Sequence, residues 1–277
     1  MCMDSDPHGM ETGMDNTIRT VTSKDGTPIA YERSGDGPPI ILVSVRSMSG
    51  PPARHWPRAL EPDFTTFVYD RRGRGASGDT APYAIEREIE DLAALIGEAG
   101  GSAAVFGYSS GAALALHAAA AGVAVTKLAL YDLPWTINCP GWSEDHAARP
   151  GADRRESTGR RSRVLPSSSA SPDDVVAQMR HAPLRPALEA IAHPRLRRHR
   201  HAGGRMPDAL PGSVAAPTLA IAGGAGAPLM RDTATALADA LPNGRSRILE
   251  GQTHDIDPAT VTPVLEEFLS EPNSTRS

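Results

Sequence analysis

The sequence has few cysteines and no long apolar run. Cys2 and Cys139 are the only cysteines in 277 residues, and one of them lies in a polar N-terminal stretch, so we expect no structural disulfide. Free cysteines are typical of a reducing compartment, which predicts a cytoplasmic protein. No apolar run approaches the roughly 20 residues that cross a bilayer. Residues 1–16 also lack the positive start and apolar core of a signal peptide, so we expect no contact with a membrane.

The chain also has no excess of positive charge. Its formal net charge is -5 at pH 7, which gives no electrostatic basis for binding nucleic acid. Metal-binding spacings such as C-x-x-C and H-x-x-x-H are absent, and so is the lysine motif of a phosphate-binding P-loop. We therefore expect no metal, no cofactor and no nucleic acid, and the expected partner is a small molecule.

Apolar strands and amphipathic helices alternate along most of the chain. Apolar runs predict strands at 40–43, 65–69, 103–106, 127–131, 218–222 and 246–249, after a β-hairpin over 17–33. Helical spacing or composition predicts helices over 55–60, 85–96, 112–120, 231–240 and 258–269. This order predicts an α/β fold with a mostly parallel central sheet and helices on both faces. In such sheets, functional sites form at the carboxyl ends of the strands.

A serine lies at the centre of the strongest motif. The pentapeptide G-Y-S-S-G at residues 107–111 follows one predicted strand and opens the next predicted helix. Strand, G-x-S-x-G and helix together predict a nucleophile elbow, in which a tight turn exposes the Ser109 hydroxyl. The same turn directs the Ser110 N–H toward the space where an oxyanion would form during acyl transfer.

Three motifs, in this order, resemble those of the α/β-hydrolase superfamily, in particular small actinobacterial-type hydrolases. They are D-x-R-G-x-G-x-S at 70–77, the elbow at 107–111 and G-x-x-H at 251–254. The resemblance implies the α/β-hydrolase fold and a serine hydrolase that cleaves a small carboxylic ester or thioester. It also implies a core over 17–133 and 213–270 with an inserted lid over 134–212, while the polar residues 1–16 are expected to form a disordered tail and 271–277 a second tail.

The resemblance points to the partners of the serine. A serine hydroxyl needs an adjacent base, and His254 stands at the family position for it. Family members often carry the acid in the loop after the strand 218–222, but this chain has Ala225 there. Asp132 stands after the preceding strand, where some branches of the family place the acid, so we predict that it orients His254. Asp255 and Asp257 are further candidates, disfavoured because they are too close in sequence to reach behind the His254 ring.

The second half of the oxyanion hole departs from the family pattern. Many relatives carry His-Gly after the strand 40–43, whereas this chain has Ser44-Val45-Arg46. We predict that the N–H of Val45 or Arg46 joins that of Ser110 as the second donor. The Arg46 side chain could also meet an anionic substrate, and the alternative is an ordinary solvated loop charge.

The predicted lid has an irregular composition. Residues 172–179 and 186–191 fit an apolar helical hairpin, whereas 143–171 and 196–205 are rich in Arg, Ser, Gly and Pro. A basic lid loop and a frame-shifted stretch of a GC-rich gene both account for this, while the lack of aromatics disfavours nucleic-acid contact. Two alternatives to the hydrolase stay open. The missing carboxylate at Ala225 and the missing His-Gly are compatible with a non-hydrolytic lyase, cyclase or acyl-transfer enzyme, and the irregular lid is compatible with a ligand-binding scaffold without turnover.

Overall fold

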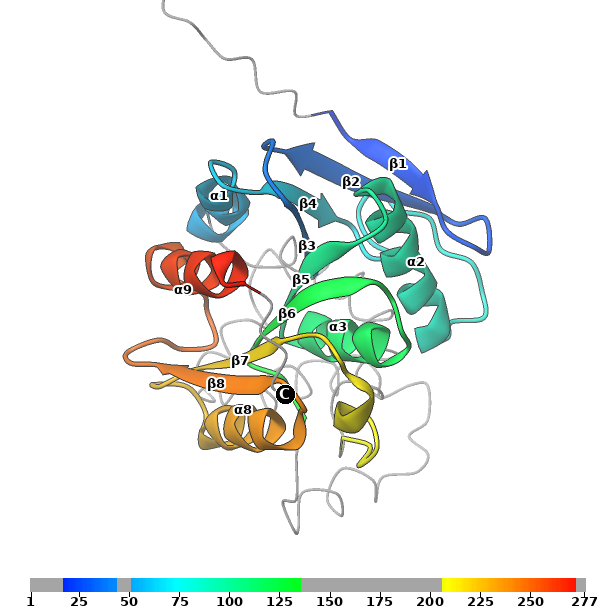
Figure 1. Ribbon diagram of the computed structural model, residues 1–277. Coiled ribbons are helices and arrows are strands. Elements are labelled where there is room, and N and C mark those ends of the chain that lie inside the picture. Colours follow the sequence, from blue (N-terminus) through cyan, green and yellow to red (C-terminus); the bar gives the residue numbers. More distant parts are fainter. Residues whose placement is uncertain (1–16, 44–50, 136–205, 273–277) are drawn as a thin grey trace, which may run out of the picture.

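The fold is built around an eight-stranded sheet (Figure 1). A computed structural model describes residues 17–43, 51–135 and 206–272. The strand order is β1-β2-β4-β3-β5-β6-β7-β8. β2 pairs antiparallel with β1 and β4, and every other neighbouring pair is parallel. The strands are β1 (Arg19–Thr22), β2 (Pro28–Ser34), β3 (Pro39–Val43), β4 (Thr65–Tyr69), β5 (Ala103–Tyr108), β6 (Val125–Tyr131), β7 (Thr218–Gly223) and β8 (Gly244–Leu249).

The helices follow the predicted order, with differences at their starts. They are α1 (Pro51–Leu60), α2 (Ile85–Glu98), α3 (Ser110–Ala120), α8 (Pro228–Ala240) and α9 (Pro258–Ser270), with a short 3-10 helix at Pro211–Ser213. α1 and α8 begin earlier than the apolar spacing predicts, each at a proline. Proline suits a first turn because its fixed φ is helical and its missing N–H would have no partner in the helix. No helix among the described residues has the length and apolar character needed to cross a membrane.

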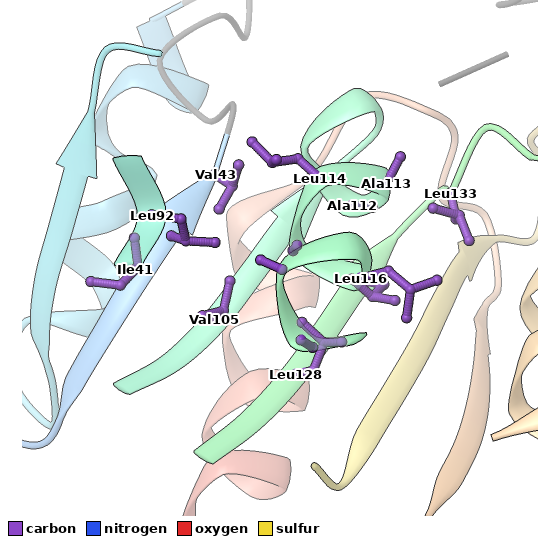
Figure 2. Packing of buried hydrophobic residues seen from close by; sticks show 14 of the residues in the cluster. Ile41, Val43, Leu92, Val105, Ala112, Ala113, Leu114, Leu116, Leu128 and Leu133 are labelled. Carbon is purple, nitrogen blue, oxygen red and sulfur yellow. The ribbon is translucent and has the colours of Figure 1, made fainter. Parts of the chain in front are cut away.

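The helices cover the sheet in two layers (Figure 1). On one face α2, α3 and α8 bury a large apolar cluster against the strands, and on the other face α1 and α9 bury a second one. Figure 2 shows Leu92 of α2 and Leu116 of α3 over Val105 and Leu128 of the central strands. All four side chains are fully buried. Burial of one such side chain stabilises the fold by roughly 1.5–3 kcal/mol, so the paired layers fix the central strands that lead to the site.

The sheet stays continuous across the predicted lid. β6 and β7 are neighbours, with Leu128 in register with Thr218, although the connection between these two strands is the longest in the sequence. Residues 136–205 of the predicted lid lie outside the described residues, so the division into core and lid stays a prediction. Trp135 and Met206, which flank that segment, are only 2% and 5% exposed and pack into the cluster of the α3 face.

Candidate active site

The elbow serine lies between β5 and α3 in a strained backbone conformation. Ser109 has φ 52° and ψ -119°, and only one other non-glycine residue of the described chain has positive φ. Such a conformation costs roughly 1–3 kcal/mol, so the surroundings must hold it. The Ser109 N–H donates to the Tyr131 carbonyl of β6 at 2.9 Å, and the Ser109 carbonyl accepts from Ala112 N–H at 2.9 Å. A Cβ at Gly107 would lie 2.6 Å from the Ala112 Cα, which is why the turn requires glycine there.

Asp132 and His254 meet although 122 positions separate them in sequence. The Asp132 Oδ2 lies 3.0 Å from the His254 Nδ1, and the Asp132 Oδ1 accepts from Gly223 N–H at 3.1 Å. The carboxylate is 1% exposed and the histidine side chain 33% exposed. A carboxylate at Nδ1 favours the tautomer that carries its proton there, which leaves Nε2 as a basic lone pair. Asp132 is also the second non-glycine residue with positive φ, at 48°.

Asp257 and Asp255, the other candidate acids, have different surroundings. Asp257 caps α9, since its side chain accepts from Ala259 N–H at 3.2 Å and from the Thr260 hydroxyl at 2.8 Å. Asp255 is exposed to solvent. Of the three aspartates that the sequence nominates, Asp132 is the one whose carboxylate bonds to the His254 ring.

The loop after β7 contacts the histidine loop through its backbone. The Ala225 N–H donates to the Gln252 carbonyl at 2.8 Å. A Cβ at Gly223 would lie 2.5 Å from that same carbonyl. Glycine is therefore needed at 223 for this close approach, and the same residue donates its N–H to Asp132. The sequence analysis did not assign Gly223 a role, and the glycine directly after the β7 apolar run was the available signal.

Two tyrosines at the site were also not foreseen. The Tyr108 hydroxyl donates to the His254 carbonyl at 3.0 Å, and the Tyr131 hydroxyl donates to the Thr253 carbonyl at 2.7 Å. The Tyr108 ring lies 5.0 Å from the His254 ring, centroid to centroid. Each tyrosine is the last residue of its strand, directly before Ser109 or Asp132, and this position was the only sequence signal.

The predicted oxyanion residues are described only in part. Ser110 is the first residue of α3, and its hydroxyl accepts from the Arg71 Nη1 at 3.3 Å. The Arg71 side chain is 3% exposed and forms a 2.5 Å ion pair with Glu88 of α2. Through these two contacts Arg71 connects the start of α3 to α2. Val45 and Arg46 lie outside the described residues, so the second donor stays a prediction.

A buried ion-pair network extends from the glycine-rich loop after β4. Arg72 is fully buried and bonds to both oxygens of Asp91, at 2.6 and 2.7 Å. Its Nη1 donates to the Asp25 Oδ2 at 2.9 Å. Asp70 organises the same loop, accepting from Ala76 N–H at 3.0 Å. Burial raises the pKa of Asp91, whereas the hydrogen bond from Arg72 lowers the pKa of Asp25.

These charged groups do not form a metal site. In residues 17–43, 51–135 and 206–272, no cluster of three or more His, Cys, Asp or Glu side chains is arranged to hold a metal ion. The site offers the chemistry of a serine hydroxyl, an imidazole and a buried carboxylate, beyond the carboxyl ends of the parallel strands.

Comparisons with known proteins agree with this architecture. The model of the alpha/beta hydrolase family matches residues 40–268. A solved alpha/beta hydrolase from Sphaerobacter thermophilus is 46% identical, with a TM-score of 0.78 over 91% of this chain and 100% of that chain. No protein of curated function matches the sequence.

More distant structures share the fold. An esterase from a Rhodococcus species is 21% identical, with a TM-score of 0.66 over 92% of this chain and 98% of that one. A thermophilic esterase from Thermogutta terrifontis is 23% identical, with a TM-score of 0.65 over 91% and 98%. The predicted fold is confirmed: on the family match and the 46% identical structure, the chain belongs to the alpha/beta hydrolase family.

Proposed function

We propose that the protein is a serine hydrolase that cleaves small carboxylic esters or thioesters through an acyl-enzyme. The observation that carries the proposal is the 3.0 Å contact between the Asp132 Oδ2 and the His254 Nδ1, beside the elbow that bears Ser109. A serine, a histidine and a buried acid are the groups that acyl transfer requires. The two distant structures named as esterases favour the same class of substrate.

The first half of the reaction acylates the serine. The Ser109 Oγ attacks the substrate carbonyl while the His254 Nε2 takes the hydroxyl proton. Asp132 holds the ring in the required tautomer and stabilises the imidazolium. The tetrahedral oxyanion accepts hydrogen bonds from Ser110 N–H and from Val45 or Arg46 N–H. Each such donor contributes roughly 10²- to 10³-fold to the rate. The alcohol or thiol then leaves with the proton from His254.

The second half regenerates the enzyme. Water attacks the acyl-enzyme as its proton moves to the His254 Nε2, and the carboxylic acid leaves as that proton returns to the Ser109 Oγ. Because the acid–base pair is built from Asp132 and His254 alone, the missing carboxylate at Ala225 does not interrupt the cycle.

A fluorophosphonate probe and p-nitrophenyl acetate test this proposal together. We expect the full-length protein to be labelled at one serine and to hydrolyse the ester, and Ser109→Ala to lose both properties. Ser102→Ala is the matched control, since Ser102 is an exposed serine just before β5, and it should react like the wild type. Labelling that persists in Ser109→Ala would refute the assignment.

The same experiment separates the two alternative functions. Strong labelling of Ser109 without ester turnover would favour acyl transfer or another non-hydrolytic reaction at the same serine. A wild-type protein that is neither labelled nor active would favour a binding scaffold.

A further inference from the structure

The two strands that carry Ser109 and Asp132 end in the same residue type. Tyr108 ends β5 and Tyr131 ends β6, and they are register partners in adjacent parallel strands. Register partners point to the same face of a sheet, and the two ring centroids are 6.1 Å apart. β5 and β6 lie side by side in the middle of the sheet (Figure 1).

Both hydroxyls reach the loop that carries His254. They donate to the carbonyls of two consecutive residues, Tyr131 to Thr253 at 2.7 Å and Tyr108 to His254 at 3.0 Å. The Tyr108 ring also lies 5.0 Å from the His254 ring, with 31° between the ring planes. The loop is therefore held at the two peptide carbonyls that flank the His254 Cα and at the imidazole itself.

Both hydroxyls stay protonated over a wide pH range. Tyr131 is fully buried and Tyr108 is 9% exposed. Burial raises the pKa of both phenols well above the ordinary value, and nearby Asp132 and Asp255 add to the shift. Neither hydroxyl ionises in the neutral range, so each can donate its proton to a carbonyl throughout that range.

We propose that Tyr108 and Tyr131 are positioning residues for His254. Together they form a tyrosine clamp, which places the imidazole against Asp132 and toward the serine that follows Tyr108. The proposal rests on the roles assigned to Ser109, Asp132 and His254 under "Proposed function". It adds that the strands delivering the nucleophile and the acid also set the position of the base.

Phenylalanine substitutions test the clamp because they remove a hydroxyl and keep the ring. Loss of one such hydrogen bond lowers the equilibrium constant for the held position of His254 roughly fivefold. We therefore expect kcat on p-nitrophenyl acetate to fall about fivefold in Tyr108→Phe and in Tyr131→Phe. In the double variant kcat should fall roughly 25-fold, the product of the two single effects. KM should change less than twofold, because the clamp acts on proton transfer rather than on ground-state binding.

Tyr31→Phe is the matched control. The Tyr31 hydroxyl donates to the Glu98 Oε1 at 2.8 Å, and the ring is 3% exposed, but it lies on β2 away from the site. This variant also loses one hydrogen bond from a buried tyrosine, and it should keep the wild-type kcat. An equal loss of kcat in Tyr31→Phe and in the clamp variants would overturn the proposal, since it would reflect general destabilisation.

A spectroscopic readout keeps this test separate from the proposed activity. The Nδ1 proton shared with Asp132 should give a downfield ¹H NMR resonance, assigned by its loss in His254→Gln. We expect this signal to broaden or vanish in the double variant and to remain in Tyr31→Phe.

If the wild type neither hydrolyses esters nor reacts with the probe, the esterase proposal fails while the resonance still tests the clamp. An unchanged resonance in a folded double variant would refute the clamp, and the single variants provide the same test if the double variant does not fold.

Discussion

Two buried carboxylates, Asp91 and Asp132, show how similar burial serves different ends. Each is 1% exposed, and each uses both oxygens as hydrogen-bond acceptors. Asp91 faces Arg72, which is always charged and completely enclosed. Asp132 faces a backbone N–H and His254, whose side chain is one-third exposed.

The difference lies in what the partner can do with a proton. An arginine holds its proton at any physiological pH, so the Asp91 pair fixes α2 to the loop after β4 and performs no chemistry. A histidine exchanges its proton near neutrality and can reach solvent or substrate. A buried acid whose partner is titratable and accessible is a candidate for chemistry, and His254 makes Asp132 such a candidate.

Asp132→Asn should produce the largest change in this comparison. The asparagine amide retains an oxygen for Gly223 N–H but presents an N–H₂ group to the His254 Nδ1, which selects the wrong tautomer. We expect kcat on p-nitrophenyl acetate to fall roughly 10³- to 10⁴-fold, with a melting temperature close to that of the wild type. Steady-state kinetics and thermal unfolding measure the two effects.

The control for Asp132→Asn is Asp255→Asn, which changes an exposed aspartate next to His254. It should leave kcat within about twofold. If Asp255→Asn were inactive and Asp132→Asn active, the two aspartates would have been assigned the wrong way round.

Arg72→Met should act on stability rather than on the reaction. It leaves Asp91 and Asp25 without their shared cation, and breaking a buried pair in this way costs about 3–5 kcal/mol. Urea unfolding should show this loss, while kcat per folded molecule stays near the wild-type value. Combining Arg72→Met with Asp91→Leu should recover part of the loss, because the buried carboxylate is then removed and only the more exposed Asp25 stays without its cation. A stable Arg72→Met variant with reduced kcat would contradict the structural role given to the Arg72–Asp91 pair.

Asp25→Asn should produce the smallest effect, and one that depends on pH. The hydrogen bond from Arg72 lowers the pKa of Asp25 below its unfolded value. The resulting stability is present above about pH 4 and is lost as the pH falls further. We therefore expect the variant to be about 1–2 kcal/mol less stable than the wild type at pH 7. The gap should narrow below pH 4 in urea unfolding, and a gap that stays constant from pH 7 to pH 3 would contradict the pairing.

The sequence predicted the sheet well because parallel strands buried on both faces appear as continuous apolar runs. The prediction of Asp132 as the acid rested on its place directly after such a run together with the resemblance to family branches that carry the acid there. Gly223, Tyr108 and Tyr131 were not assigned because their contacts span 91 to 146 positions. Contacts of that kind depend on strand register, which no local pattern encodes. The role of Val45 and Arg46 and the nature of the lid stay predictions, since these residues lie outside those described.

The positive φ angles at Ser109 and Asp132 have a consequence for how this protein can be stabilised. Glycine would adopt either conformation without strain, and each strained residue costs roughly 1–3 kcal/mol. Glycine would relieve this strain at either position, whereas the proposed acyl transfer requires the serine hydroxyl and the aspartate carboxylate. Stabilising substitutions compatible with activity should accordingly be sought in the two helical layers, away from these two positions.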